Sequence, residues 1–138
     1  MCAGVDSSGA LEVIIKKLKI IIPIPPVTKK NSQQIIYVKG RHLPIPSKKY
    51  KEYEAGCEAF LYQYRNIDID YKVNVKCIYF MPTKRRVDLV NLQEATLDVL
   101  VAYKIIDDDN SQIVAAMDGS RVYYDKENPR TEIEISCL

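Results

Sequence analysis

The alternation of apolar and polar residues predicts a strand and a loop at the start of the chain. The segment from Leu11 to Ile24 is rich in β-branched residues and predicts a strand that ends at Pro23, with its alternation blurred as in a buried strand. Two prolines followed by polar residues predict a loop over residues 24–32. Its cations and amides suit a phosphate backbone.

A hairpin and a helix are predicted next. Residues 35–38 and 43–45 flank Lys39-Gly40-Arg41, which predicts a hairpin with a basic tip. Ser47 can cap a helix that runs to about Tyr64. Its apolar residues recur at helical spacing and are expected to pack in the core: Tyr50, Tyr53, Cys57, Phe60, Leu61 and Tyr64.

The second half of the chain predicts a strand, a helix and short strands. Residues 72–80 alternate well, with Val73, Val75, Cys77 and Tyr79 on one side and Asn74, Lys76 and Ile78 on the other, which indicates a strand. A helix is predicted from near Asp88 to about Tyr103. Its expected buried residues are Leu89, Leu92, Leu97, Leu100 and Val101. Short strands with turn residues between them are predicted at 112–116, 121–124 and 131–136.

These elements predict the fold class. The order β-hairpin-α-β-α-β-β is typical of an α+β fold, here a single domain with a mixed β-sheet and two main helices. The chain has 138 residues, of which 47% are hydrophobic, and this is enough material for one core. We expect the domain to span residues 11–138 and residues 1–10 to form a disordered tail.

Charge is distributed unevenly along the chain. Residues 1–51 hold ten Lys or Arg against two acids, whereas residues 52–138 hold ten against sixteen. The basic part could bind phosphate and the acidic part could bind metal. The alternative is that both parts simply present solvated charge on their surfaces.

Cysteine, histidine and hydropathy exclude several classes of protein. The four cysteines are far apart and form no C-x-x-C pair, so neither a zinc knuckle nor a dense disulfide framework is indicated. His42 is the single histidine, which leaves no material for a His ligand cluster or a Ser-His-Asp triad. The apolar run at residues 20–22 is too short to span a bilayer, and no secretion signal is seen, so a cytoplasmic location is expected.

Two charged segments carry the candidate chemistry. Lys84-Arg85-Arg86 precedes Asp88 at the start of the second predicted helix, and Asp107-Asp108-Asp109 follows the end of that helix. Phosphodiester cleavage needs cations for the substrate phosphates and carboxylate oxygens for the hard metal ions that activate water. The pairing of these segments favours an enzyme that acts on nucleic acid.

The same residues carry a family resemblance. Pro25-Pro26, Lys30-Asn31, Met81-Pro82, the basic run before Asp88 and the acidic loop occur in the order found in the RusA family of Holliday junction resolvases, which the chain resembles from about residue 20 onward. The resemblance implies a small, dimeric, magnesium-dependent endodeoxyribonuclease, common in prophages, that cuts four-way junctions by paired nicks. It also implies roles in DNA recombination and repair.

The chain departs from the family pattern at two helix positions and one loop position. The family helix opens D-x-D-N-x-x-K, where the aspartates bind metal and the lysine assists catalysis, but here Val90 replaces the second aspartate and Glu94 replaces the lysine. In the D-D-x-Q loop, alignment on Gln112 places Asn110 at the last aspartate, whereas counting from Asp88 places Asp109 there. We prefer Asp109, because a carboxylate offers Mg²⁺ two charged oxygens.

We therefore expect a rebuilt metal site. Glu94 lies about 9 Å along the helix from Asp88 and could replace the missing aspartate. The expected catalytic residues and metal ligands are Asp88, Glu94 and Asp109, with Asp108 or Asp118 as a candidate fourth ligand for Mg²⁺ or Mn²⁺. Asp98, about 15 Å from Asp88 along the helix, is expected to be a structural acid paired with a basic strand residue. The alternative is that Glu94 is a solvated residue of a degenerate enzyme.

Binding of branched DNA is expected to use the basic segments. The residues expected to contact DNA are Lys29, Lys30, Asn31, Arg41, Lys84, Arg85, Arg86 and Arg121. Tyr37 or Tyr50 could stack at the junction centre, although core packing is the more common use of tyrosine. Two symmetric nicks in a nearly two-fold junction call for a C2 homodimer. The competing functions are a DNA-binding protein of the same fold that has lost cleavage, and a purely structural domain.

Overall fold

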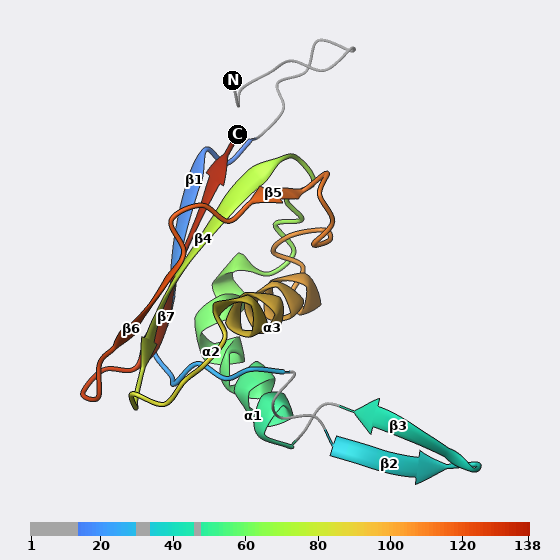
Figure 1. The fold of residues 1–138 in the computed structure, drawn as a ribbon. Coiled ribbons are helices and arrows are strands. Elements are labelled where there is room, and N and C mark those ends of the chain that lie inside the picture. The colour runs from blue at the N-terminus through green and yellow to red at the C-terminus, as the bar shows by residue number, and fades with distance from the viewer. Residues whose placement is uncertain (1–13, 30–33, 46–47) are drawn as a thin grey trace.

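A five-stranded mixed sheet forms one layer of the molecule and the helices form the other (Figure 1). This computed structural model describes residues 14–29, 34–45 and 48–138, so the tail expected at residues 1–10 lies outside the described residues. The strand order is β1-β7-β4-β5, with β6 paired to the C-terminal half of β4. β7 is antiparallel to β1 and β4, whereas β5 and β6 are parallel to β4. The strands are β1 (Lys17–Ile22), β4 (Val73–Met81), β5 (Val114–Ala116), β6 (Arg121–Tyr124) and β7 (Arg130–Cys137). The α+β prediction is confirmed.

Alternation along the strands separates a core face from a face without helices. The core face of β4 consists of Val73, Val75, Cys77 and Tyr79, as predicted, and all four are at most 1% exposed. In β1, Ile20 and Ile22 are buried but Ile21 is 48% exposed. The expectation that β1 is buried on both faces is therefore wrong, because β1 is an edge strand that alternates and ends just before Pro23.

The first predicted helix is broken into three short pieces on the core side of the sheet. They are α1 (Lys48–Gly56), α2 (Glu58–Leu61) and the 3₁₀ turn η2 (Tyr62–Tyr64). The break follows Gly56, a poor helix former whose backbone passes close to Ile24. Tyr50, Tyr53, Cys57 and Leu61 are buried as predicted, whereas Phe60 and Tyr64 are only partly buried. The proposed cap residue Ser47 lies outside the described residues.

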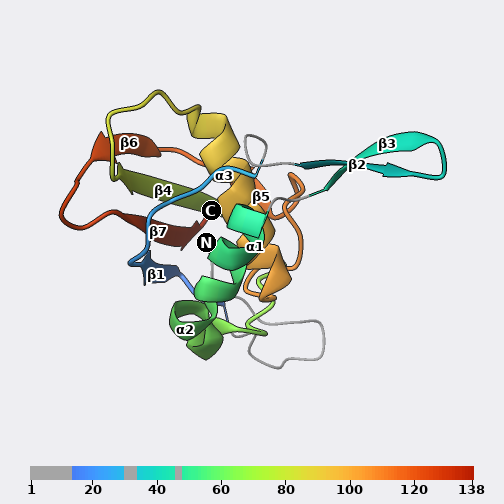
Figure 2. The ribbon, with the colours of Figure 1, turned by 90° about the horizontal axis from the view of Figure 1, so that it is seen from below.

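The second helix, α3 (Leu89–Ala102), lies beside α1 and α2 on the same face of the sheet (Figures 1 and 2). Of its predicted buried residues, Leu92 and Leu100 are buried, but Leu89, Leu97 and Val101 are only partly buried. The face that packs on the sheet instead includes Asn91, Ala95, Thr96 and Val99. The prediction was wrong there because small and polar residues fill the contact with the sheet. An apolar stripe is thus left toward solvent.

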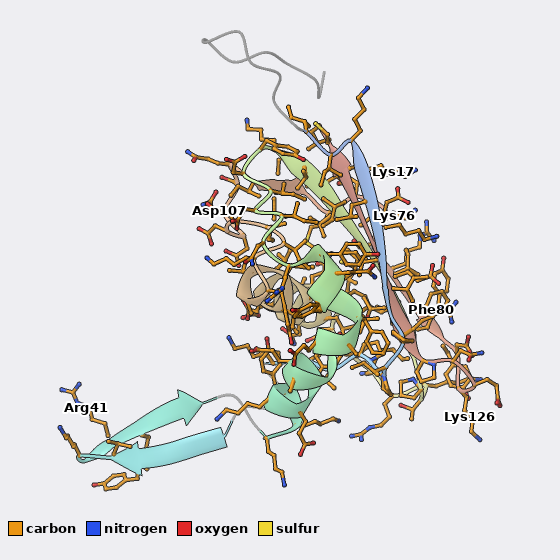
Figure 3. All side chains as sticks on the ribbon, turned by 180° about the vertical axis from the view of Figure 1, so that it is seen from behind. Lys17, Arg41, Lys76, Phe80, Asp107 and Lys126 are labelled. Carbon is orange, nitrogen blue, oxygen red and sulfur yellow. The ribbon has the colours of Figure 1, made fainter. Side chains whose placement is uncertain are left out.

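The predicted hairpin forms a separate two-stranded sheet that projects from the body of the protein (Figures 1 and 2). Its strands are β2 (Gln34–Val38) and β3 (Arg41–Ile45). Lys39 (φ 49°) and Gly40 (φ 78°) form the turn, and two positive φ angles are what a tight hairpin turn of this twist requires. Arg41 lies at the far end of the arm (Figure 3). Over the part of the chain that the structure describes, no helix is long and apolar enough to cross a membrane.

Candidate active site and nucleic-acid interface

Asp88 lies where the chain passes from the sheet into α3. It is the N-cap residue of the helix, and its carbonyl oxygen accepts the backbone N–H groups of Asn91 and Leu92. The side-chain amide of Asn91 donates to Asp88 Oδ2 over 3.3 Å. Asn91 is 7% exposed, while Asp88 is exposed. A buried amide therefore orients an accessible carboxylate.

The acidic loop follows α3 at its other end. Ile105 and Ile106 are fully buried and anchor the start of the loop in the core. The Asp108 carboxylate accepts hydrogen bonds from the backbone N–H of Asp109 and from the side-chain amide of Asn110, each with a donor–acceptor distance of 2.8 Å. These hydrogen bonds, first of all the one from the Asp109 backbone, hold the pKa of Asp108 below its usual range. Asp108 thus shapes the loop, and Asp109 is exposed.

The acidic loop borders an open cleft of about 380 Å³ beside the last turns of α3. Lys29 belongs to the loop that begins at Pro25-Pro26, called here the proline loop. Its side chain reaches into this cleft, and its Nζ lies 3.0 Å from Asp98 Oδ2. Asp98 therefore pairs with a loop lysine and not with the expected strand residue. The cleft is lined by Lys29, Tyr50, Glu54, Asp98, Val101, Ala102, Asp108 and Asp109.

The carboxylates expected to share one ion do not converge within the chain. Asp88 and the acidic loop lie at opposite ends of α3, a helix of 14 residues and hence about 21 Å long. The cleft reaches back only to Asp98, still about 15 Å along the axis from Asp88. Glu94 is exposed between them. Among the described residues, no group of three or more His, Cys, Asp or Glu side chains could hold a metal ion.

Asp118, the other candidate ligand, lies away from Asp88 and from the acidic loop. Its backbone N–H donates to Asn74 Oδ1 over 2.7 Å, and Asn74 Nδ2 donates back to the Asp118 carbonyl over 3.2 Å. Asn74 belongs to the face of β4 opposite the buried residues, as does Lys76, which Figure 3 shows on the far side of the sheet from Asp107. The turn that contains Asp118 therefore packs at the helix-free face of the sheet.

A basic groove lies next to the segment that precedes Asp88. It has a volume of about 410 Å³ and is bounded by the proline loop on one side and the segment after β4 on the other. The structure thus brings the Pro25–Thr28 segment next to Arg85 and Arg86 of the basic run. The groove lining contains three cations and no acid: Lys49, Arg85 and Arg86. Lys49 was missed from the sequence, although the Lys48-Lys49-x-Lys51 run at the start of α1 was a signal for it.

The other residues expected to bind DNA are dispersed. Lys84 lies over the Tyr124 ring, 5.1 Å from its centroid, and Arg121 is exposed at the start of β6. Arg41 is at the tip of the hairpin arm (Figure 3). Lys29 points into the acidic cleft, and Lys30 and Asn31 lie outside the described residues.

Exposed aromatic rings lie on the hairpin and on β6, where Lys84 contacts the Tyr124 ring. Tyr37, on the hairpin, is 69% exposed and packs edge-on against His42, with ring centroids 5.2 Å apart. Tyr50 is 3% exposed, and burial raises the pKa of its hydroxyl, so it is a core residue and not a stacking surface. Tyr123 and Tyr124 of β6 are each 46% exposed and were not singled out from the sequence. Rings beside cations can stack on unpaired bases.

The two free cysteines of the described region are not nucleophiles. Cys57 and Cys77 are fully buried, and burial raises the pKa of each thiol to about 12. The thiolate is the reactive form, and both buried thiols stay protonated at neutral pH. Neither cysteine can therefore act as a nucleophile, and both serve as core residues. Hydrolysis by an activated water remains the chemistry that the carboxylates can support.

Comparison with known proteins identifies the family of the chain. No curated protein matches the chain. A family model described as endodeoxyribonuclease RusA matches residues 23–136, which include the proline loop, the basic groove, α3 and the acidic loop. With most of its length covered, the chain belongs to the RusA endodeoxyribonuclease family.

Proposed function

We propose that the protein is a divalent-metal-dependent endodeoxyribonuclease that resolves Holliday junctions or related branched DNA by paired symmetric nicks, in recombination and repair in the cytoplasm. The observation that carries this proposal is the groove with Lys49, Arg85 and Arg86, whose lining extends to Val87, the residue before the exposed Asp88. A groove lined by cations can hold a DNA backbone in front of that acid. Family membership supports the choice of branched DNA as substrate.

The donor chemistry of the site suits magnesium, but one protomer does not assemble it. Carboxylate oxygens are the ligands that Mg²⁺ and Mn²⁺ prefer, and such an ion lowers the pKa of a bound water. Two carboxylates on one Mg²⁺ place their oxygens within about 4.5 Å of each other. Asp88 and Asp109 are separated by the length of α3 within one chain. They can bind the same ion only if each comes from a different protomer.

The exposed stripe of α3 supports such a composite site. Val90 is 70% exposed, and Leu97 and Val101 are only partly buried, so apolar side chains follow the solvent side of the helix at helical spacing. In a C2 dimer the same surface packs on itself, and with the two-fold axis perpendicular to the helices the two α3 helices would lie antiparallel. Asp88 of one protomer would then lie beside Asp109 of the other, and Glu94, about 9 Å along the helix from Asp88, would extend its longer side chain toward this pair. The expected ligands Asp88, Glu94 and Asp109, with Asp108 as a further ligand, are retained in this form.

DNA binding is proposed to use the groove and the residues around it. Lys49, Arg85 and Arg86 would hold the backbone next to the cut, and Lys84 and Arg121 would extend the contact along β6. The hairpin arm with Arg41 would reach a duplex arm, since a two-stranded ribbon fits the major groove of DNA. Each phosphate contact by a lysine or arginine makes binding weaker at higher salt.

The second candidate is a branched-DNA-binding protein of the same fold that does not cleave. Two observations favour it: Val90 is a solvent-exposed apolar residue at a family metal position, and no three ligands converge in the described part of one protomer. In this case the basic groove would still bind junctions.

A labelled four-way junction separates the candidates. The protein is first bound in EDTA, and Mg²⁺ or Mn²⁺ is then added. Symmetric nicks that disappear in Asp88→Asn but persist in Asp70→Asn, a change at an exposed acid outside the site, support the nuclease. Tight binding without nicks supports the second candidate. Failure to bind would refute both.

A further inference from the structure

Lys29 is the one cation among the described residues that line the acidic cleft. Its ammonium lies 3.0 Å from Asp98 Oδ2 and 5.7 Å from the centroid of the buried Tyr50 ring. The cleft also contains Glu54, Asp108 and Asp109. A lysine from the proline loop is therefore held at a fixed place among four carboxylates.

The Lys29–Asp98 ion pair adds little to the stability of the fold, so stability does not explain why Lys29 lies in the cleft. The Lys29 and Asp98 side chains are 31% and 29% exposed, and ion pairs that reach solvent contribute little to folding because water and salt screen them. The main effect of Lys29 is to make the electrostatic potential of the cleft less negative. Without it, the described lining of the cleft would hold acids alone as charged groups.

Besides the proposed metal ion, a phosphodiester that enters an acidic cleft needs positive side chains to offset the repulsion from the carboxylates. The neighbouring helix cannot supply them, since α3 contains neither lysine nor arginine. Arg85 and Arg86 line the groove near the other end of that helix. Lys29 is thus the cation in the cleft lining that can meet a phosphate at the acidic loop, whereas Lys104, whose charge also lowers the pKa of Asp108, is not part of that lining.

We propose that Lys29 is a catalytic residue that contacts the scissile phosphate, an assignment that rests on the proposed nuclease function. Asp98 holds the ammonium in the cleft until DNA arrives, and a phosphate oxygen then takes the place of the Asp98 carboxylate. During hydrolysis the oxygen of water bonds to phosphorus while the bond to the leaving sugar oxygen breaks. The water gives up one proton to solvent and the leaving oxygen takes one. Lys29 keeps its protons and donates a hydrogen bond to a non-bridging oxygen, where negative charge grows.

The test compares Lys29→Gln with Lys17→Gln. Lys17 forms a similar ion pair with Glu134 at 3.6 Å on the sheet and lies outside the site. Single-turnover nicking of a four-way junction in Mn²⁺ is expected to slow about 100-fold in Lys29→Gln, the usual effect of losing one donor to a developing charge. Junction affinity in EDTA is expected to stay within about twofold, since the groove cations remain. Lys17→Gln is expected to behave as the parent in both assays.

A readout apart from cleavage comes from metal binding. Removing a positive charge from among carboxylates strengthens cation binding, so Mn²⁺ titration followed by electron paramagnetic resonance is expected to give a Kd about threefold to tenfold lower for Lys29→Gln. A merely structural role would not produce slower cleavage together with tighter metal binding.

A variant that keeps the charge completes the design. Lys29→Arg retains a positive charge and hydrogen-bond donors at this position, so it is expected to keep at least about ten times the rate of Lys29→Gln. Nicking by Lys29→Gln at the parent rate would overturn the proposal, as would a loss of junction affinity as large as the loss of rate. A parent protein that binds junctions but never nicks them would refute the proposed function itself, and the role of Lys29 with it.

Discussion

Mixing two inactive variants tests whether the active site is shared between protomers. Asp88 and the acidic loop are separated by about 21 Å of helix in one chain, about five times the span that one Mg²⁺ can bridge. Asp88→Asn and Asp109→Asn are each expected to be inactive alone. In a heterodimer of the two, one composite site has both substitutions and the other keeps Asp88 and Asp109 intact. Random exchange makes about half of the dimers heterodimers, so about one quarter of all sites are restored.

The assay measures nicks in a labelled four-way junction after the two variants have exchanged subunits, with exchange followed by native mass spectrometry. The mixture is expected to nick at about one quarter of the parent rate, and to cut one strand per binding event, because each heterodimer has a single working site. The matched control mixes Asp88→Asn with the double variant Asp88→Asn, Asp109→Asn, which restores no site in any dimer. A mixture no more active than its components, despite full exchange, would refute the composite site.

Further predictions concern DNA binding, the core and the acidic loop. Arg85→Gln or Arg86→Gln should reduce the slope of log Kd against log salt by about 0.9 each in fluorescence anisotropy, and an unchanged slope, or an equal effect of Lys17→Gln, would contradict the groove. The Thr96 hydroxyl donates to the Leu92 carbonyl and lies 2.7 Å from the Tyr79 hydroxyl, so Thr96→Val should leave a buried donor unpaired and lower the free energy of unfolding in urea by about 1–3 kcal/mol. Thr83→Val, at an exposed site, should change it by less than about 0.5 kcal/mol; equal losses would disprove the role of the Tyr79 contact. The lowered pKa of Asp108 adds stability above the usual aspartate pKa of about 3.9 that is lost as the pH falls through the lowered value, so Asp108→Asn should show a smaller fall in thermal stability between neutral and strongly acidic pH. An unaltered pH dependence would show that these hydrogen bonds do not act on folding.

Local patterns determined the elements and the chemical character of this protein. Alternation at residues 72–80 predicted β4, and a Lys-Gly pair between apolar runs predicted the hairpin turn, because both signals depend only on neighbours along the chain. The basic run before α3 and the aspartates after it were also visible as short motifs. These motifs were enough to indicate the RusA family, which the family match confirms.

Tertiary packing decided which faces are buried and which charges meet. The sheet packs against Ala95, Thr96 and Val99, so the larger Leu97 and Val101 remain partly exposed. Helical spacing alone does not show which side of the helix faces the sheet. The rigid length of α3 keeps Asp88 apart from Asp109, although the motifs looked close when read along the sequence. Folding also carries Lys29 across to Asp98, 69 positions later in the chain. Such contacts depend on how distant elements fit together in space, and a pattern of neighbours contains no information about that fit.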